Sequence, residues 1–394
     1  MELAVIGGGP AGLRAAEIAA SAGVSVTLFD AMPSVGRKLL VAGKGGLNLT
    51  HGEPADAFAS RYQGPGMPDG LWRELLADFD TNALRGWAEG LGVETFQASS
   101  GRIYPVSMKA APLLRRWISR LKSLGIRFAT RHKWTSLTPV RPHRIGFANG
   151  TQADAHAVIF ALGGGSWPQT GSDGSWLPVF ADLGVRCHSL EPANCGWECP
   201  WPNEVLENAE GKPLKNIRVE ADGIRVEGEL LITRYGIEGG AIYRLGHILR
   251  TMELPQITID FKPAHTAEQL AAKLGDTRRN LLTTARSAWK LGDAAHAILS
   301  TRPWPDAATL ARAAKRFPLH LTKPRPLPEA ISSAGGIRWD EFDANLMLTK
   351  LPGIFAAGEM IDWEAPTGGY LIHGCLVTAT KAASGAVGWL RANP

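Results

Sequence analysis

Residues 1–30 read MELAVIGGGPAGLRAAEIAASAGVSVTLFD and place a strand, a turn, a helix and a second strand in one run. The apolar run 3–6 is typical of a buried parallel strand. It leads into the G-x-G-x-x-G turn at 7–12 and an alanine-rich helix that Gly23 stops. The second strand, 24–29, ends on Asp30. This order predicts an α/β fold that begins with a Rossmann-type unit.

The glycines of this turn have separate roles. Gly7 permits the tight turn, Gly9 lets the backbone approach a pyrophosphate, and Gly12 lets the helix pack on the strand. The helix then begins with free N–H groups and partial positive charge facing the anion. Asp30 lies about 20 residues further on, where a carboxylate accepts ribose hydroxyls. A dinucleotide site is therefore favoured over a glycine-rich turn without a ligand.

Composition sets the limits of the fold. The 394 residues are enough for about two or three domains. Hydrophobic residues make up 45% of the chain and charged residues 20%, which suits a large core. The net charge of +5 comes without a basic tract, since Arg115–Arg116 and Arg278–Arg279 are only pairs. This excess indicates solubility more than a polyanion partner.

The four cysteines form no C-x-x-C motif, so neither a zinc ribbon nor a thioredoxin-type pair is expected, and no metal site is predicted. Cys195 and Cys199 lie close enough in sequence to meet, but unpaired, reduced thiols in a cytoplasmic protein are favoured. We expect no signal peptide, because the first strand begins at once. No apolar run approaches the ~20 residues of a membrane helix.

The segment 31–51, AMPSVGRKLLVAGKGGLNLTH, is too rich in glycine and too apolar for a simple solvent loop. Its glycines allow backbone to pass close to a large, flat ligand. Arg37, Lys38 and Lys44 add positive charge near the expected pyrophosphate, while Asn48 and His51 suit a polyol or a ring edge. The alternative is a glycine-rich connection with solvated bases.

The rest of the chain predicts an interrupted fold. Helices at 69–79, 81–91 and 110–124 precede a small antiparallel meander at 134–155, with Asn149–Gly150 as a hairpin turn. A buried strand at 157–162 ends in three glycines, which we expect to pass beside the same ligand. Short β-type runs and a helical block follow. We predict a discontinuous nucleotide-binding domain at 1–186 and 322–394, a β-rich insert at 187–264 and a helical insert at 265–321.

The closing segment repeats the opening pattern. A buried strand, 353–357, runs into Gly358–Glu359 and so places a carboxylate beside backbone N–H groups. Gly368–Gly369 then starts an apolar helix, whose first N–H groups point at whatever lies above it. We expect both features to contact the ligand of the first turn.

Five stretches resemble the HI0933-like flavoprotein family, NAD(P)/FAD-dependent oxidoreductases of the type with two dinucleotide-binding domains. They are GGGPAG at 7–12, GRKLLVAGKGGLNLTH at 36–51, IYPVSMKA at 103–110, ALGGGSWPQTGSDG at 161–174 and GIFAAGEMIDWEAPTGGYLIHG at 353–374. Relatives commonly carry G-R-C-N where this chain has GGLN at 45–48, so it resembles a subgroup with GKGGLN. A mechanism that needs that thiol has no residue for it here.

The resemblance implies a resident, non-covalent FAD in the discontinuous domain. The expected contacts come from the glycine turn, the second strand, the 31–51 segment, the meander, the 161–163 turn and the last helix. They are Gly7, Gly9, Pro10, Ala11, Gly12, Asp30, Ala31, Arg37, Lys38, Gly43, Lys44, Gly45, Gly46, Asn48, Trp134, Ala161, Leu162, Gly163, Gly358, Glu359, Gly368, Gly369, Tyr370 and Leu371.

The predicted function is an FAD-dependent oxidoreductase acting on a small apolar or unsaturated carbonyl substrate. No second nucleotide fingerprint is evident, so NAD(P)H is expected to dock transiently. One alternative is an RNA-modifying flavoprotein, since some relatives in the wider superfamily modify tRNA and the pI is about 9.0. A basic, aromatic-studded face is not evident, so the sequence does not favour a nucleic-acid partner. The other alternative is a non-catalytic flavin-binding redox sensor.

Proton-transfer candidates are Lys44, Tyr104, Tyr370 and His373, with His51 as a further one. Each has a structural alternative: the lysine neutralises phosphate, the tyrosines pack, and the histidines make hydrogen bonds. The helix starting near Gly369 is a candidate for stabilising negative charge on reduced flavin. Neither the substrate nor an oligomeric state follows from the sequence.

Overall fold

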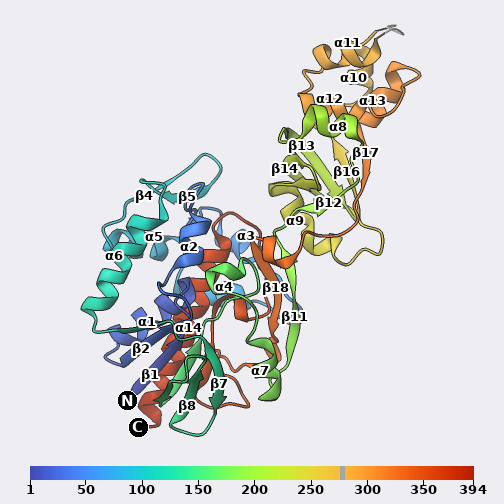
Figure 1. Cartoon of the computed structure of the whole chain (residues 1–394). Coiled ribbons are helices and arrows are strands. Elements are labelled where there is room, and N and C mark those ends of the chain that lie inside the picture. Colours follow the sequence, from blue (N-terminus) through green and yellow to red (C-terminus); the bar gives the residue numbers. More distant parts are fainter. Residues whose placement is uncertain (276–279) are drawn as a thin grey trace. The chain divides into compact units, whose positions relative to one another are not determined.

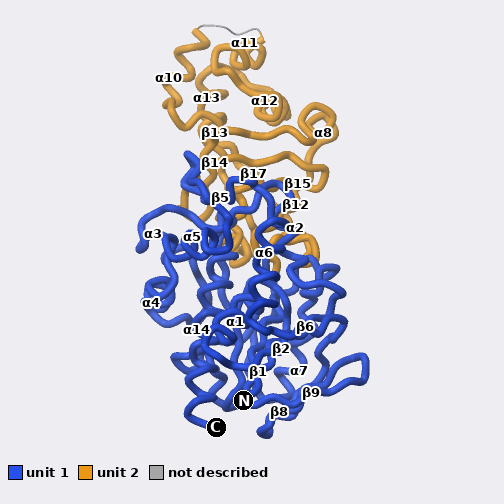
Figure 2. Tube along the Cα trace, turned by 90° about the vertical axis from the view of Figure 1, so that its left-hand side faces the viewer, with its two compact units in different colours: residues 1–191, 332–394 blue, residues 192–331 orange. Residues whose placement is uncertain are grey.

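The computed structural model describes residues 1–275 and 280–394 (Figure 1). The pair Arg278–Arg279 lies outside these residues. The chain divides into two compact units, residues 1–191 with 332–394, and residues 192–331 (Figure 2). No helix in the described part of the chain is long and apolar enough to cross a membrane.

A five-stranded parallel sheet forms the centre of unit 1, in the order β19-β10-β1-β2-β6. The first strand, β1 (Glu2–Ile6), lies in the middle, so the turn that follows it opens at the carboxyl edge of the sheet. Strands β2 (Ser25–Asp30) and β10 (Ala157–Phe160) flank it, and β19 (Ile354–Ala356) and β6 (Arg127–Thr130) are the outer strands. The sheet thus brings the first, middle and last thirds of the chain together.

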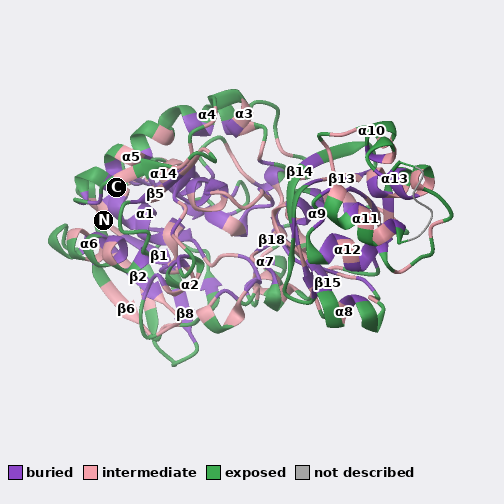
Figure 3. Ribbon diagram, turned by 90° about the horizontal axis from the view of Figure 1, so that it is seen from above, coloured by how far each residue is buried: buried purple, intermediate pink, exposed green. Residues whose placement is uncertain are grey.

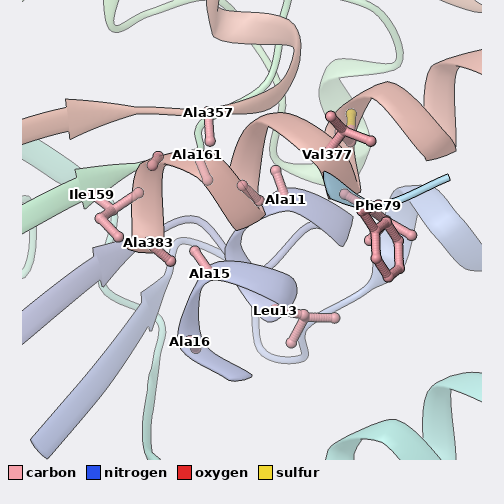
Figure 4. Packing of buried hydrophobic residues seen from close by; sticks show 14 of the residues in the cluster. Ala11, Leu13, Ala15, Ala16, Phe79, Ile159, Ala161, Ala357, Val377 and Ala383 are labelled. Atoms are coloured by element: carbon pink, nitrogen blue, oxygen red, sulfur yellow. The ribbon is translucent and has the colours of Figure 1, made fainter. Parts of the chain in front are cut away.

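Alternation along β1 gives the sheet two buried faces. Leu3 and Val5 belong to the core shared with helices α1 (Pro10–Ser21) and α14 (Tyr370–Ala392). Ala4 and Ile6 belong to the core on the other face, under the meander. Figure 3 shows the central strand β1 mostly as buried ribbon. Small side chains such as the labelled alanines of Figure 4 let α1 and α14 approach each other and the sheet closely.

The predicted meander is confirmed as three antiparallel strands, β7 (Trp134–Thr138), β8 (His143–Phe147) and β9 (Gln152–Ala155). The hairpin between β8 and β9 lies where Asn149–Gly150 predicts it, but its turn differs from the two-residue type. Gly150 has φ +81° and its N–H bonds to Phe147 O at 3.0 Å, whereas Asn149 has no positive φ, so the loop spans three residues, 148–150. A second small sheet of unit 1 contains β3 (Thr50–His51), β5 (Arg102–Pro105) and β4 (Thr95–Gln97). Parallel sheet and meander together confirm the α/β fold class.

The remaining elements of unit 1 are mostly short helices around the sheet. They are α2 (Arg37–Ala42), α3 (Ala55–Ala59), α4 (Leu71–Asp78), α5 (Thr81–Gly90), α6 (Ala110–Ser123), α7 (Leu177–Asp182), the strands β11 (Cys187–Ala193) and β18 (Ser332–Ile337), and the 3-10 turns η1 (Pro168–Thr170), η3 (Trp339–Glu341) and η4 (Gly358–Met360).

Unit 2 contains a six-stranded antiparallel sheet, in the order β12-β15-β14-β13-β16-β17, and a group of short helices. The strands are β12 (Trp197–Glu198), β13 (Pro213–Ala221), β14 (Ile224–Thr233), β15 (Gly236–Glu238), β16 (Gln256–Asp260) and β17 (Phe317–His320). The helical elements are α8 (Asn203–Ala209), α9 (Gly240–Leu249), α10 (Ala267–Ala272), α11 (Leu281–Ala288), α12 (Asp293–Leu299), α13 (Ala307–Lys315) and η2 (Leu327–Glu329).

The two predicted inserts share one core in unit 2. Val219 and Ile259 come from the sheet, and Leu270, Ala285 and Leu310 come from the helical block. The capping box at Thr266 is present, with Gln269 at its third helical position. The division into separate β-rich and helical domains therefore stays a sequence-based proposal, while the compact unit contains both.

Candidate functional site

A pocket at the carboxyl edge of the parallel sheet is lined by five segments of unit 1. These are the glycine turn with the start of α1, the end of β2, the start of α2, the turns after β10, and the end of β19 with one residue of α14. The lining residues are Gly7, Gly8, Gly9, Pro10, Ala11, Asp30, Ala31, Gly36, Arg37, Lys38, Ala161, Leu162, Gly163, Thr170, Gly171, Ser172, Ala357, Gly358, Glu359 and Cys375. Figure 4 labels Ala11, Ala161 and Ala357, one from each of three of these segments.

The three glycines of the first turn meet different surroundings. A Cβ on Gly7, whose φ is +108°, would lie 2.2 Å from the Ala161 carbonyl oxygen. A Cβ on Gly12 would lie 1.7 Å from the Gly7 carbonyl oxygen. No protein atom lies within 4 Å of a Cβ built on Gly9. Protein packing thus requires two of the glycines, whereas Gly9 keeps open space at the pocket.

Asp30 lines this pocket and also shapes the turn. Its Oδ2 accepts the Gly8 backbone N–H at 2.7 Å, and its Oδ1 accepts that of Met32 at 2.7 Å. Burial raises the pKa of this carboxyl above its usual value, and the two backbone hydrogen bonds oppose that rise. Each oxygen keeps a second lone pair, so the carboxylate can still accept a ligand hydroxyl.

Lys38 joins the two ends of the chain in the pocket. Its Nζ lies 3.2 Å from Glu359 Oε2 and 3.4 Å from Ser172 Oγ. Both members of the ion pair are mostly buried, with side-chain exposures of 20% and 11%. Lys38 comes from α2 and Glu359 from η4 after the last sheet strand. A cation and a carboxylate therefore share one wall of the pocket.

A second group of predicted residues lies around β3, β5 and the start of α14. The 43–51 loop runs beside β5, where Leu47 N–H bonds to Met108 O at 2.8 Å and Leu49 N–H to Ile103 O at 2.9 Å. A Cβ on Gly369 would lie 2.5 Å from Thr50 Cα, so the start of α14 packs directly on this loop. Near this junction lie Gly43, Lys44, Gly45, Gly46, Asn48, Gly368, Tyr370 and Leu371.

Two helices run from the pocket to this second group. Helix α2 leads from Lys38 to Gly43, and α14 leads from Cys375 back to Tyr370. At 1.5 Å per residue, each path covers about 8 Å. The two groups of residues are thus adjacent parts of one extended site.

The aromatic and acidic groups of the second part are linked by hydrogen bonds. The Tyr370 hydroxyl donates to Glu53 Oε1 at 2.7 Å, and Arg61 pairs with the same carboxylate at 2.7 Å. The His51 ring stacks on Tyr370 with centroids 5.5 Å apart. Despite partial burial, bonds from Arg61 and Tyr370 hold the pKa of Glu53 below its usual value. Tyr370 is therefore held in place by an ionised partner.

His373 is fully buried at the second turn of α14. Its Nε2 lies 2.8 Å from the Phe79 carbonyl oxygen, which can only accept, so Nε2 carries the proton. Its Nδ1 then accepts the Thr50 hydroxyl at 2.7 Å. Burial lowers the pKa of His373 to about 4. This neutral, doubly bonded ring fixes α14 on β3 and suits a structural role more than proton transfer.

Of the other proton-transfer candidates, Lys44 is exposed. Tyr104 is half-buried beside the loop, and its ring would lie 3.7 Å from a Cβ on Gly46. Its ring stacks with Phe96 at a centroid distance of 6.0 Å. No described residue makes a hydrogen bond with the Tyr104 hydroxyl.

One expected contact, Trp134, lies away from both parts of the site. Trp134 packs in the core between meander and sheet, with Phe160 at 4.7 Å and Phe180 at 5.5 Å between ring centroids. The alternation of β7 turns this indole inward, which explains the difference from the expectation. Asp362, three residues after Glu359, is buried and pairs with His188 Nδ1.

Sequence reasoning missed several lining residues. Thr170, Gly171 and Ser172 reach the pocket from the turn at η1, where Gly171 has φ +103°. Their signal was present, because this turn belongs to the GGGSWPQTGSDG stretch that follows β10. Cys375 had no signal beyond its position on α14. It is an unpaired, buried thiol whose pKa is raised by burial. Burial also raises the pKa of the half-buried Cys187 and of the buried Cys199.

The model of a protein family, the HI0933-like protein Rossmann domain, matches residues 1–385. The chain belongs to the HI0933-like family. Two relatives of the chain have the name ribosomal RNA dihydrouridine synthase. That of Haemophilus influenzae is 24% identical over 67% of this chain and 65% of its own length, so the match spans just under two thirds of it. That of Escherichia coli is 22% identical over 93% of both chains.

A solved structure shows the same fold. The 3-ketosteroid-Δ4-(5α)-dehydrogenase from Rhodococcus jostii superposes with a TM-score of 0.54 over 98% of this HI0933-like chain and 97% of its own. The two sequences are 16% identical, so the likeness is one of fold.

Proposed function

We propose that this HI0933-like protein is an oxidoreductase that holds FAD non-covalently in the extended site. The observation that carries this proposal is the joining of Lys38, from the first segment, to Glu359, from the last, beside the glycine turn. An elongated dinucleotide needs contacts along its whole length. The glycine turn suits the phosphates, Asp30 the ribose, and the β3–α14 junction the ring system.

The residues present fit such a group. Arg37 Nε and Asn48 Oδ1 are buried without a hydrogen-bond partner in the protein, one in the pocket and one in the loop beside β5. Helix α1 begins at Gly9 and Pro10 with no capping side chain and no acid in its first turn. Open polar groups and an uncompensated helix N-terminus are what a diphosphate requires. When bound, FAD supplies hydride transfer from a donor to an acceptor.

The chain's own residues set the surroundings of the reaction. The start of α14 directs backbone N–H groups at the β3 junction, where they favour negative charge. The Tyr370–Glu53–Arg61 network holds this start in position. Tyr104, whose hydroxyl is not engaged by a described residue, is the proton donor we favour among the four candidates. NAD(P)H is proposed as a transient donor.

The acceptor we propose has a C=C bond conjugated with a carbonyl. Uracil is a member of this class, because its 5,6 double bond is conjugated with the C4 carbonyl. Two relatives are named ribosomal RNA dihydrouridine synthase. Making dihydrouridine from uridine is the reduction of this bond. We therefore propose uracil in RNA as the first acceptor to test and small enones as the second.

The test begins with the purified protein, which is expected to be yellow and to retain FAD through gel filtration. Anaerobic NADH or NADPH should bleach its 450 nm band, and adding the acceptor should restore it. Acceptors are transcribed ribosomal RNA, free uridine and cyclohexenone. A protein that neither retains nor takes up FAD contradicts the proposal. Restoration by RNA or uridine supports the uracil assignment, and restoration by the enone alone overturns it.

A further inference from the structure

Unit 2 contains a group of basic side chains that the proposed reaction does not use. Five residues, Lys262, His265, Lys273, Lys290 and Lys315, here called the basic cluster, come from five places in its sequence. They lie after β16, before α10, after α10, after α11 and at the end of α13. No basic face is evident in the sequence, because these residues are never adjacent in the chain.

Hydrogen bonds link the members of the basic cluster. Lys262 Nζ donates to the Lys290 carbonyl at 2.9 Å, and Lys315 Nζ donates to the Lys262 carbonyl at 2.8 Å. Lys273 Nζ lies 3.1 Å from His265 Nε2. These contacts, which for Lys290 involve its backbone carbonyl, bring the five basic residues together in one region of unit 2.

Acidic residues neutralise little of this charge. Lys315 pairs with Asp260 at 2.7 Å, and Asp260 is itself buried. Glu268, the other acid nearby, bonds to the Thr266 cap at the start of its own helix. The pKa of Lys262 is lowered by burial and then by the charges of Lys273 and Lys290, as expected for like charges held together. A bound anion would relieve this repulsion.

The region around the basic cluster carries an excess of positive charge. Residues 256–275 and 280–320 contain eight lysines and arginines against four aspartates and glutamates. Residues 101–150 are more basic still, with eleven lysines and arginines and no acid. What distinguishes the cluster is that contacts in the fold bring its basic residues together.

A groove continues from the basic cluster. A cavity of about 640 Å³ is lined by basic residues, namely His265 and Lys315 of the cluster with Arg218, Arg225 and Arg316, and by the acids Glu220, Asp260 and Glu268. Arg218 and Arg225 are paired with Glu227 and Glu220, respectively. Arg316 is exposed, and its guanidinium forms no ion pair within the described residues. Arg316 thus extends the positive surface beyond the lysines, while the other arginines of the groove are paired with acids.

We propose that the basic cluster and this groove bind the phosphate backbone of the RNA substrate. The inference rests on the proposed function, because it assumes an RNA acceptor. Lysines are flexible point charges that suit phosphates and read no sequence. A surface of this kind would add affinity for a long RNA and none for free uridine. Each neutralised phosphate contributes about 0.7–0.9 to the salt dependence of binding.

The experiment compares the double variant Lys273→Glu/Lys290→Glu with the wild type in the full chain. Both side chains are exposed, and Lys273→Gln/Lys290→Gln is the milder version. The matched control is Lys122→Glu/Lys215→Glu, which places the same charge change on two exposed lysines elsewhere. Filter binding with a transcribed ribosomal RNA fragment is measured from 50 to 300 mM salt. Circular dichroism verifies folding.

The Kd of the Glu variant should rise about 10- to 100-fold at low salt, and the slope of log K against log salt should fall by about 1.4–1.8. The Gln variant should shift in the same direction by less, and the control should match the wild type. Equal RNA affinity and slope in variant and wild type would overturn the proposal, as would a wild type that binds no RNA. FAD retention and bleaching by NAD(P)H test the proposed function separately, and no cluster variant should change them.

Discussion

Lys38 Nζ and Glu359 Oε2 lie 3.2 Å apart although 321 residues separate them in the chain. Because this pair closes the pocket between α2 and the last sheet strand, Lys38→Met should weaken FAD binding. A charge-assisted hydrogen bond is worth about 1.5–3 kcal/mol, or roughly 10- to 100-fold in Kd. Fluorescence titration of apoprotein with FAD measures this. Lys122→Met on α6 is the control, and equal Kd values for both variants would contradict the assignment.

The glycine turn allows fold and ligand effects to be separated. Gly12→Ala should destabilise the protein, because its Cβ would lie 1.7 Å from the Gly7 carbonyl oxygen. Gly9→Ala should fold normally, because no protein atom lies within 4 Å of its Cβ, but should lose at least about tenfold in FAD affinity. Urea unfolding and FAD titration check the two effects.

Gly86→Ala on α5 is the control for both, since its Cβ also meets no atom within 4 Å. A helix-interior alanine there should add about 0.5–1 kcal/mol of stability and leave FAD affinity unchanged. A Gly9→Ala variant with wild-type FAD affinity would contradict the assignment of the glycine turn to the FAD site.

Glu17 is a buried carboxylate that holds α1 against its neighbours. Its oxygens accept from Trp87 Nε1 at 3.0 Å, Trp117 Nε1 at 2.9 Å and Arg120 Nη1 at 2.9 Å. Arg14, 7% exposed, is its other ionic partner. Glu17→Leu should cost about 3–5 kcal/mol, since it leaves a buried cation unpaired. Urea denaturation measures this loss in the free energy of unfolding, and Glu89→Leu at an exposed position is the control.

Acid should destabilise the protein through its buried histidines. His373 and His143 both have pKa values lowered to about 4 by burial, against 6.5 in the unfolded chain. The unfolded state therefore binds protons first, and stability falls as pH drops from about 6.5 toward 4. Each histidine should contribute a loss of about 2 kcal/mol between pH 7 and pH 5.

His373→Gln should reduce the pH dependence of stability by about half, which unfolding midpoints at several pH values measure. It should leave hydride transfer intact, which flavin reoxidation measures. The exposed His320→Gln serves as the control. An unchanged pH slope in His373→Gln would contradict the link between this residue and acid sensitivity. A large loss of turnover with stability preserved would assign the residue to catalysis instead.

Tyr104→Phe tests the proton donor. Flavin reduction by NAD(P)H should be unchanged, whereas reoxidation by the acceptor should slow by about 10²–10⁴-fold. Stopped-flow absorbance at 450 nm separates the two half-reactions. Tyr370→Phe is the comparison, because that hydroxyl is already bonded to Glu53. If Tyr370→Phe slows reoxidation and Tyr104→Phe does not, the proton comes from Tyr370.

Much of the local structure follows from the sequence. The strand–turn–helix–strand of residues 1–30, the hairpin turn at Asn149–Gly150 and the capping box at Thr266 all appear where their motifs predict them. Turns and caps depend on φ angles and on hydrogen bonds between near neighbours, so a few residues are enough to determine them. The resemblance to the family likewise depended on contiguous motifs.

The tertiary structure alone decided which distant residues meet. Packing of the parallel sheet brought Ser172 and Glu359 to Lys38, and the inward face of β7 turned Trp134 into the core. The basic cluster of unit 2 arose in the same way from separate turns. Such contacts depend on strand order and helix packing over hundreds of residues, and no local pattern of charge or hydrophobicity specifies them.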